Sequence, residues 1–250
     1  MKRKLPAVFA VTALLLIWQL VCWAGIVPAF MLPSPVQVVQ AFWAERYVLL
    51  EHSVITLGEA FLGLAVGVFL GCLFAVVMDH VPVLRRACYP VLLLTQTVPT
   101  VAIEPVLVLW FGYEMTPKVI LIVLTTFFPV TVGLLEGFSG VDEDAVGLLR
   151  SMGANRWQIF RHIKWPSALP QFFSGLRIAA AYCVVGAVIS EWLGGFGGLG
   201  VYMTRVKKAF AFDKMFAVIF LISAISLGLM ALVEVAQRLC MPYRKYEREK

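Results

Sequence analysis

Two features of this 250-residue chain have the residue types and spacing of a chemical site. The first is the run Gly195–Gly200, which matches the G-x-G-x-x-G pattern of dinucleotide-binding turns. That pattern cradles a pyrophosphate only where it joins a strand to a helix in a βαβ unit. Here it follows a long apolar segment, so we interpret it as a flexible external turn or a short helix. The chain contains no G-x-x-x-x-G-K-[ST] segment, so any ATP hydrolysis must belong to another polypeptide.

The second feature is an acidic residue inside an apolar segment. Glu104 lies between Pro99 and Pro105, and an ionisable group at membrane depth is by default a functional hypothesis. With its polar neighbours it could line a pathway and meet a cationic or hydrogen-bonding solute. It could equally be a carboxylate at a subunit interface or at the aqueous rim. The residues of this candidate pathway are Gln96, Thr97, Thr100 and Glu104.

The other reactive residues form no catalytic or metal-binding set. His52, His80 and His162 lie in separate segments, with no nucleophile or further ligand at a suitable spacing. The five cysteines are odd in number and include no CxxC pair, which indicates neither a disulfide framework nor a zinc site. We therefore expect neither an enzyme nor a metal protein. The acids near the ends of apolar segments, where solvated or structural roles are expected, are Glu59, Glu136 and Glu234.

The composition is that of a membrane protein. Hydrophobic residues make up 61% of the chain and charged residues 14%, whereas a soluble domain is about half apolar and about a quarter charged. The net charge of +6 could indicate a nucleic-acid partner, but Lys and Arg cluster beside apolar runs and form no continuous basic face. The sequence therefore predicts contact with a lipid bilayer and no contact with nucleic acid.

Apolar segments of helical length predict an all-α polytopic membrane protein with one domain over residues 1–250. About 20 apolar residues in a helix cross the hydrocarbon core. The first segment is longer than the core of a signal peptide and lacks a cleavage site, so we interpret it as an uncleaved span. The predicted spans are residues 7–27, 55–78, 89–111, 118–138, 171–193 and 215–239.

The distribution of basic residues predicts the orientation. With both termini in the cytoplasm, most of the 21 Lys and Arg residues lie on cytoplasmic segments, as the positive-inside rule requires. The polar stretch 142–170 then lies in the cytoplasm as well. The basic residues left outside are Arg46, Lys118, Arg205, Lys207, Lys208 and Lys214.

Prolines and glycines predict how the segments join and pack. Leu32–Pro35 ends the first helix, and residues 36–50 suit a helix that lies at the membrane interface. The second span carries a stripe of small residues that permits close helix contact in lipid, at Gly58, Gly63, Gly67 and Gly71.

Residues 142–170 predict a helical hairpin between two spans. Acidic residues follow Asp142, where a helix N-terminus favours them, and Gly153 suits the left-handed stop of this first helix. Asn155 and Gln158 predict a capping box for a second helix, which we expect Pro166 to end. The apolar faces of the two helices fit a loop that packs on its own protein, and they fit a docking site for a partner as well.

The hairpin resembles a motif of the permease subunits of bacterial ABC importers. Gly153, Ile163 and Pro166 match the G and I-x-L-P positions of their cytoplasmic "EAA" motif. Gly147–Leu149 stand at the E-A-A positions and Trp165 replaces the leucine, so the acidic residue of the motif is absent. The resemblance implies a coupling site for an ATPase, made of Leu148, Leu149, Met152, Gly153, Ala154, Trp157, Phe160, Ile163 and Pro166.

The resemblance covers nearly the whole chain. Segments similar to the nitrate, sulfonate and taurine branch of these permeases are Leu32–Pro35, His52–Leu57, Pro105–Gly112, Gly175–Ile178, Glu191 and Gly198–Gly200. Segments similar to permeases for pyrimidine precursors of thiamine are Trp110–Tyr113, Gly186–Gly194 and Gly200–Met203. The likeness implies a gating or structural role for Glu191, which joins the candidate pathway.

The family implies a transport subunit and not an enzyme, with a pathway between two six-helix permease copies in the bacterial inner membrane. Its expected partners are a second permease copy, two cytoplasmic ATPase subunits that hold ATP-Mg, and a periplasmic or lipid-anchored binding protein. This chain itself is expected to bind no cofactor. The expected solute is a thiamine-precursor pyrimidine, with nitrate, a sulfonate, taurine or riboflavin as alternatives. A six-span secondary transporter or channel and an intramembrane enzyme are the rival classes.

Overall fold

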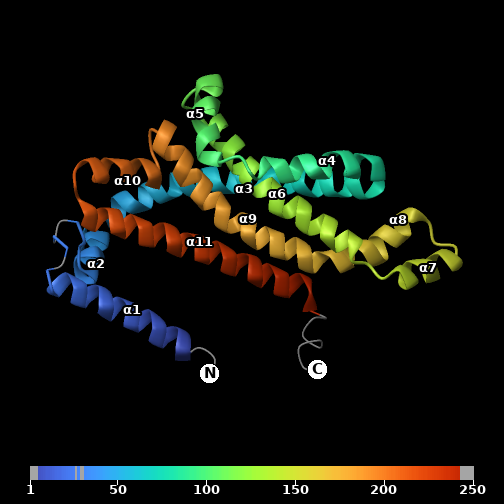
Figure 1. Cartoon of the computed structure of the whole chain (residues 1–250), viewed down its shortest axis with the longest axis horizontal. Coiled ribbons are helices and arrows are strands. Elements are labelled where there is room, and N and C mark those ends of the chain that lie inside the picture. The colour runs from blue at the N-terminus through green and yellow to red at the C-terminus, as the bar shows by residue number, and fades with distance from the viewer. Residues whose placement is uncertain (1–4, 26, 29–30, 243–250) are drawn as a thin grey trace.

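The structure is a computed structural model that describes residues 5–25, 27–28 and 31–242. This part of the chain is helical and has no strand, which confirms the all-α prediction. Four long helices run alongside one another down the long axis of the molecule (Figure 1). They are α3 (Arg46–His80), α6 (Met115–Ser139), α9 (Trp165–Gly194) and α11 (Phe212–Cys240).

Shorter helices lie at the two ends of this bundle. The helices α7 (Glu143–Ser151) and α8 (Arg156–Ile159) form the hairpin at one end, which we call the hairpin end (Figure 1). At the other end, which we call the α10 end, lie α2 (Pro35–Ala44) and α10 (Leu199–Lys208).

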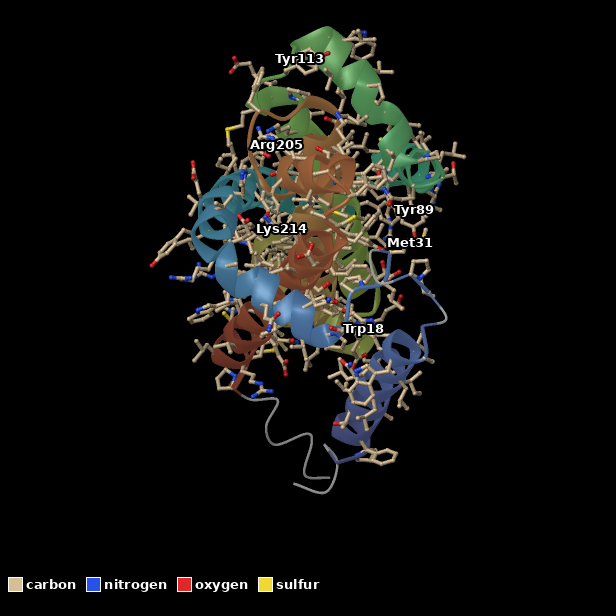
Figure 2. The ribbon with its side chains drawn as sticks, turned by 90° about the vertical axis from the view of Figure 1, so that its left-hand side faces the viewer. Trp18, Met31, Tyr89, Tyr113, Arg205 and Lys214 are labelled. Atoms are coloured by element: carbon tan, nitrogen blue, oxygen red, sulfur yellow. The ribbon has the colours of Figure 1, made fainter. Side chains whose placement is uncertain are left out.

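The described residues contain four helices that are long and apolar enough to cross a bilayer: α3, α6, α11 and the continuous helix Arg156–Gly194. The first helix, α1 (Leu5–Trp23), has a shorter apolar stretch and packs at the edge of the bundle. Its Trp18 ring lies 5.8 Å from the rings of Phe216 and Phe220 in α11, and Figure 2 shows it from the α10 end. The count of six spans therefore stays a prediction.

The third predicted span, residues 89–111, contains three prolines and is broken in the structure. The chain forms α4 (Pro82–Thr95) and α5 (Thr100–Phe111), which are bent by 97° relative to each other. Pro99 precedes α5 in extended backbone and steers Val98 out of the helical region, so α4 cannot continue through this point. If the broken pair counts as one span, the described residues contain five.

The backbones of α6 and α9 touch because glycine stands at their crossing. A Cβ atom on Gly175 of α9 would collide with the carbonyl oxygen of Pro129 in α6. Further along the same seam, a Cβ on Gly133 of α6 would lie 2.8 Å from the carbonyl oxygen of Gln171. Small residues allow such an approach, and dispersion contacts over the whole seam then hold helices together in lipid.

The predicted glycine stripe of α3 is confirmed at three of its four positions. Cβ atoms there would press on Ile122, Thr126 and Val130, so this face of α3 packs against α6. The expectation is wrong for Gly58, where no atom lies within 4 Å of the position of a Cβ. The glycines in contact are Gly63, Gly67 and Gly71.

The predicted caps of the hairpin are confirmed. The Asp142 side chain accepts a hydrogen bond from the Asp144 amide at the start of α7. Gly153 follows α7 with φ +83°, a left-handed conformation that glycine adopts without strain. Asn155 and Gln158 each accept a hydrogen bond from the other's backbone amide at 2.8 Å, which is the capping box.

The predicted stop of the second hairpin helix at Pro166 is wrong. The helix α8 continues through a π-helical turn, Phe160–Lys164, directly into α9. In this turn the Trp165 amide donates to the Phe160 carbonyl, one residue further back than in an α-helix. The change of register places Pro166 in the first turn of α9, where a residue without an N–H is tolerated.

We predict that Gly175→Val disrupts the contact between α6 and α9. The valine side chain would collide with the backbone carbonyl of Pro129, which cannot rotate away as a flexible side chain could. The free energy of unfolding should therefore fall by about 3 kcal/mol. The matched control is Gly228→Val in α11, where nothing lies within 4 Å of the added Cβ. Unfolding titrations of the purified protein in detergent measure both. Equal unfolding midpoints for the two variants would contradict the packing described here.

Candidate functional site

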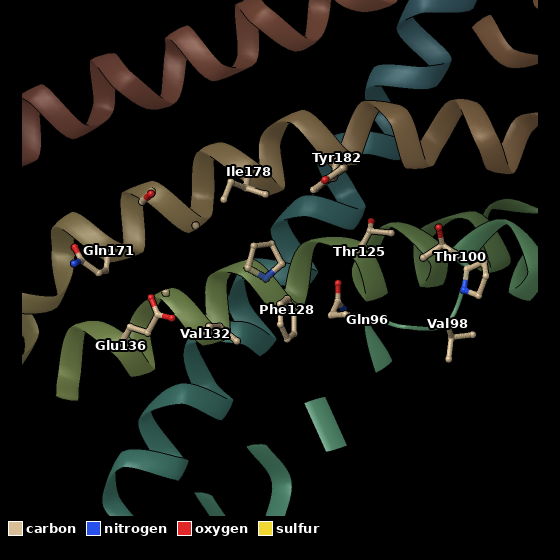
Figure 3. Close-up of a pocket in the computed structure, with 15 residues that line it drawn as sticks. Gln96, Val98, Thr100, Thr125, Phe128, Val132, Glu136, Gln171, Ile178 and Tyr182 are labelled. Carbon is tan, nitrogen blue, oxygen red and sulfur yellow. The ribbon is translucent and has the colours of Figure 1, made fainter. Parts of the chain in front are cut away.

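A cavity of about 750 Å³ runs along the bundle between α6, α9 and the junction of α4 with α5 (Figure 3). Its walls come from the two helices whose backbones touch and from the residues around the break at Pro99. The residues that line it are Gln96, Val98, Pro99, Thr100, Thr125, Phe128, Pro129, Val132, Gly133, Glu136, Gln171, Ser174, Gly175, Ile178 and Tyr182.

The polar groups of this cavity gather at its two ends. Glu136 and Gln171 lie toward the hairpin end, while Gln96, Thr125 and Tyr182 lie toward the α10 end (Figure 3). Apolar side chains occupy the stretch between them. No lysine, arginine or histidine is among the lining residues. The cavity therefore offers hydrogen bonds and one carboxylate, but no positive charge.

Only part of the predicted pathway set lines this cavity. Gln96 and Thr100 do, whereas the Thr97 hydroxyl donates to the Leu94 carbonyl within its own turn. The buried Glu104 carboxylate instead accepts a hydrogen bond of 2.7 Å from the Ser190 hydroxyl and so ties α5 to α9. Glu104 keeps one oxygen without a partner among the described residues.

Glu191 belongs to a network that holds the turn Gly195–Gly200 at the α10 end. Its carboxylate accepts a hydrogen bond from the Thr56 hydroxyl at 2.6 Å and one from the Gly200 amide at 2.5 Å. Thr56 in turn accepts from the Leu199 amide at 2.8 Å. These side chains occupy the backbone amides that a phosphate would need, so the glycine-rich run acts here as an anchored turn before α10.

A buried ion pair lies beside this network and was not foreseen from the sequence. Lys118 Nζ lies 2.5 Å from Glu59 Oε1, and the two side chains are 7% and 6% exposed. Both residues lie near predicted span ends, and for Glu59 we expected a solvated or structural role there. Because the partners are 59 residues apart and on different helices, no local pattern in the sequence connects them.

The hairpin residues divide into an outward and an inward set. Leu148, Met152 and Trp157 are 64%, 74% and 61% exposed. Phe160, in contrast, is buried against Phe138, with ring centroids 5.5 Å apart. Of the other predicted coupling residues, Gly153 is exposed, while the partly exposed ones are Leu149, Ala154, Ile163 and Pro166.

Comparison with known proteins identifies the class that this arrangement belongs to. A profile of the binding-protein-dependent transport system inner membrane component matches residues 67–241. The chain belongs to this family of ABC importer permeases, which confirms the family resemblance seen in the sequence. It is therefore a multi-pass inner-membrane transport subunit and not an enzyme, and its class works with an ATPase and a binding protein.

Individual relatives cover almost the whole chain. It is 36% identical over 233 residues to the formylaminopyrimidine transport permease ThiX of Halalkalibacterium halodurans, with 93% of each protein covered. It is 32% identical to the riboflavin permease RibX of Chloroflexus aurantiacus, covering 90% of this chain and 85% of the relative. Identity to the aliphatic sulfonates permease SsuC of Bacillus subtilis is 29%, with 96% and 86% covered.

A solved structure shares the fold. The MetNI methionine ABC transporter, in an inward-facing conformation, matches with a TM-score of 0.70 and 15% identity. The match covers 78% of this chain and 97% of the other. The helical arrangement described above is thus that of an ABC permease.

We predict that Lys118→Met strongly destabilises the α10 end. Removal of the ammonium leaves the Glu59 carboxylate buried without its charge partner, which costs about 3–5 kcal/mol of folding free energy. Lys214→Met is the matched control, because Lys214 pairs with Glu45 in a more exposed position and such pairs contribute about 0–1 kcal/mol.

Unfolding titrations in detergent measure both variants, together with the double variant Lys118→Met/Glu59→Met. Replacing both charges by apolar groups removes the unpaired carboxylate, so the double variant should recover most of the lost stability. A double variant as unstable as Lys118→Met alone would argue against an ion-pair role.

Proposed function

We propose that the exposed face of the hairpin is the docking site for the ATPase that drives transport. Leu148, Met152 and Trp157 present large apolar surfaces to solvent next to the turn at Gly153. Exposed apolar patches rimmed by polar residues favour a protein partner. On this proposal ATP-Mg binds to the partner ATPase, and the present chain holds no cofactor.

The helix geometry supports transmission of movement from the hairpin to the cavity. The continuous helix Arg156–Gly194 begins in the hairpin, lines the cavity with Gln171 and Tyr182, and ends beside Glu191. A displacement at its first turn therefore acts on the cavity wall and on the α10 end through one connected element. The two states that coupling requires would differ in the position of this helix.

We propose that two copies of the chain assemble around the pathway, with the hairpin end in the cytoplasm. The α4–α5 break forms part of the cavity wall, and on this proposal a second copy packs beside it. The exposed side chains of this region include Leu94, Val98 and Val101, which are apolar and suit a buried interface. Arg85, Arg86 and the basic residues of the hairpin lie at the cytoplasmic end in this orientation, as the positive-inside rule requires.

The lining of the cavity supports an uncharged heteroaromatic solute such as a thiamine-precursor pyrimidine. Amide and hydroxyl groups can pair with ring nitrogens and exocyclic amines, and Glu136 can accept a hydrogen bond from an amine. A sulfonate, taurine or nitrate would meet a carboxylate and no cation in this cavity. The relative with 36% identity is named for formylaminopyrimidine transport, which agrees with this choice.

We predict that Trp157→Glu abolishes ATPase docking. Trp157 is the largest side chain on the exposed face, and buried aromatic anchors carry most of the binding energy of an interface, at about 2 kcal/mol or more each. The affinity of the purified permease for its ATPase should therefore fall at least tenfold, measured by co-purification and by titration.

Val83→Glu is the matched control for this experiment. Val83 is an exposed apolar residue near the same end of the bundle, at the start of α4 and outside the hairpin. It should leave the affinity for the ATPase within about twofold of the wild type. Undiminished docking of the Trp157→Glu variant would count against the hairpin as the coupling site.

We predict that Glu136→Gln lowers pyrimidine uptake by the complete transporter in proteoliposomes about tenfold. A hydrogen bond to a charged acceptor contributes about 1.5–3 kcal/mol, and the amide replaces it with a weaker, neutral one. Glu114→Gln is the control, because Glu114 is exposed and does not line the cavity.

Formylaminopyrimidine, riboflavin, taurine and an alkanesulfonate should be compared in the same assay. Uptake of the pyrimidine in preference to the anions supports the substrate assignment. Preferential uptake of taurine or the sulfonate would refute it while leaving the ATPase-coupling role intact.

A further inference from the structure

A second cavity, of about 390 Å³, lies at the hairpin end between the corner of α3 with α4 and the hairpin. It shares no residue with the cavity between α6 and α9. Its walls come from two parts of the chain that are far apart in the sequence: the corner where α3 meets α4, and the hairpin from α7 through α8 to the π-helical turn. The lining residues are Asp79, His80, Pro82, Val146, Arg150, Arg156, Ile159, Phe160 and Lys164.

The charges of this cavity are unbalanced in favour of cations. Lys164 Nζ lies 2.8 Å from both carboxylate oxygens of Asp79, so the only acid in the lining is already paired. The guanidinium groups of Arg150 and Arg156 make no hydrogen bond or ion pair with the described residues. Two arginine side chains are thus left to bind an external anion.

The hairpin fold brings these two arginines to the same cavity. Arg150 lies in the last turn of α7 and Arg156 in the first turn of α8. The left-handed turn at Gly153 reverses the chain between them. A guanidinium group presents a planar fork of N–H donors that matches the oxygen atoms of a phosphate, and two such forks can grip one phosphate from both sides.

The remaining lining gives the cavity an apolar floor and one further polar group. Ile159 and Phe160 line the cavity and are buried, and the Phe160 ring lies 5.2 Å from the His80 ring. His80, the further polar group, is held in place because its Nδ1 donates to the Val76 carbonyl at 2.9 Å. A cationic rim over an apolar floor suits a phosphate that is attached to a hydrocarbon group.

We propose that this cavity binds a phosphate group, supplied by the headgroup of an anionic phospholipid. The cavity adjoins the end of α3, directly after the predicted span 55–78, and basic pockets between membrane helices bind anionic headgroups. A bound phosphate would connect the hairpin through Arg150 and Arg156 to the α3–α4 corner. An effect of the bound phosphate on hairpin movement rests on the proposed coupling role, whereas phosphate binding itself does not.

The test uses the purified full-length permease in detergent, without the ATPase. Native mass spectrometry measures binding of phosphatidylglycerol, with phosphatidylcholine as the zwitterionic comparison, whose phosphate is balanced by its own ammonium group. The wild type should prefer phosphatidylglycerol by roughly tenfold or more, as expected for two arginines at a membrane surface. The double variant Arg150→Gln/Arg156→Gln should lose this preference.

Arg161→Gln is the matched control, because Arg161 is an exposed arginine of the same hairpin that does not line the cavity. It should keep the preference within about twofold. A preference that survives in the double variant, or that falls equally in Arg161→Gln, would overturn the proposal.

A second arm distinguishes lipid from free phosphate. Inorganic phosphate is titrated at constant ionic strength, and the thermal unfolding midpoint is recorded for the same variants. A rise in the unfolding midpoint that requires Arg150 and Arg156 supports the phosphate site and assigns it to a soluble ligand. If neither phosphatidylglycerol nor phosphate binds through these arginines, the site does not exist. Because no ATPase is present, failure of ATPase docking has no effect on either arm.

Discussion

The contact between the backbones of α6 and α9 is the constraint on which the rest of the structure depends. In lipid no hydrophobic effect draws helices together, so their association requires a close fit, and here Gly175 and Gly133 provide it. The same two helices form opposite walls of the cavity, and the hairpin is the segment that joins their ends. One helix pair therefore fixes the position of both the cavity and the proposed docking surface.

The helix Arg156–Gly194 connects the hairpin to the α10 end as one continuous element. With 39 residues it is about 58 Å long, more than the thickness of a hydrocarbon core. Its far end is fixed by polar contacts of Glu191 and Ser190, and Lys118 with Glu59 fixes the adjoining helices. Buried polar contacts thus hold the helices together at the α10 end. At the hairpin end, in contrast, large apolar side chains are exposed.

Local patterns predicted the local features of this fold well. Hydrophobic length located α3, α6 and α11, and the caps at Asp142 and Asn155 follow from side chains within three residues of the backbone they bind. Features that depend on distant parts of the chain were not predictable in this way. Lys118 meets Glu59 only after α3 and α6 pack, and the 97° bend near Pro99 depends on what α5 packs against. The same limit explains why Gln96 and Thr100 line the cavity while Glu104 does not.

Because of the π-helical turn at Phe160–Lys164, the spacing of residues in the sequence does not by itself give the direction in which the hairpin side chains point. This wider turn takes one residue more than the α-helical register, and each residue of an α-helix turns the chain by about 100°. A shorter chain at this point would point Trp157 to a different side of the molecule without changing any hairpin residue. Two permeases with the same spacing from the hairpin glycine to the proline can therefore present different faces to their ATPases. On the proposal that the hairpin docks the ATPase, the helical type of this segment decides which face the ATPase meets, and the spacing of the motif alone does not reveal it.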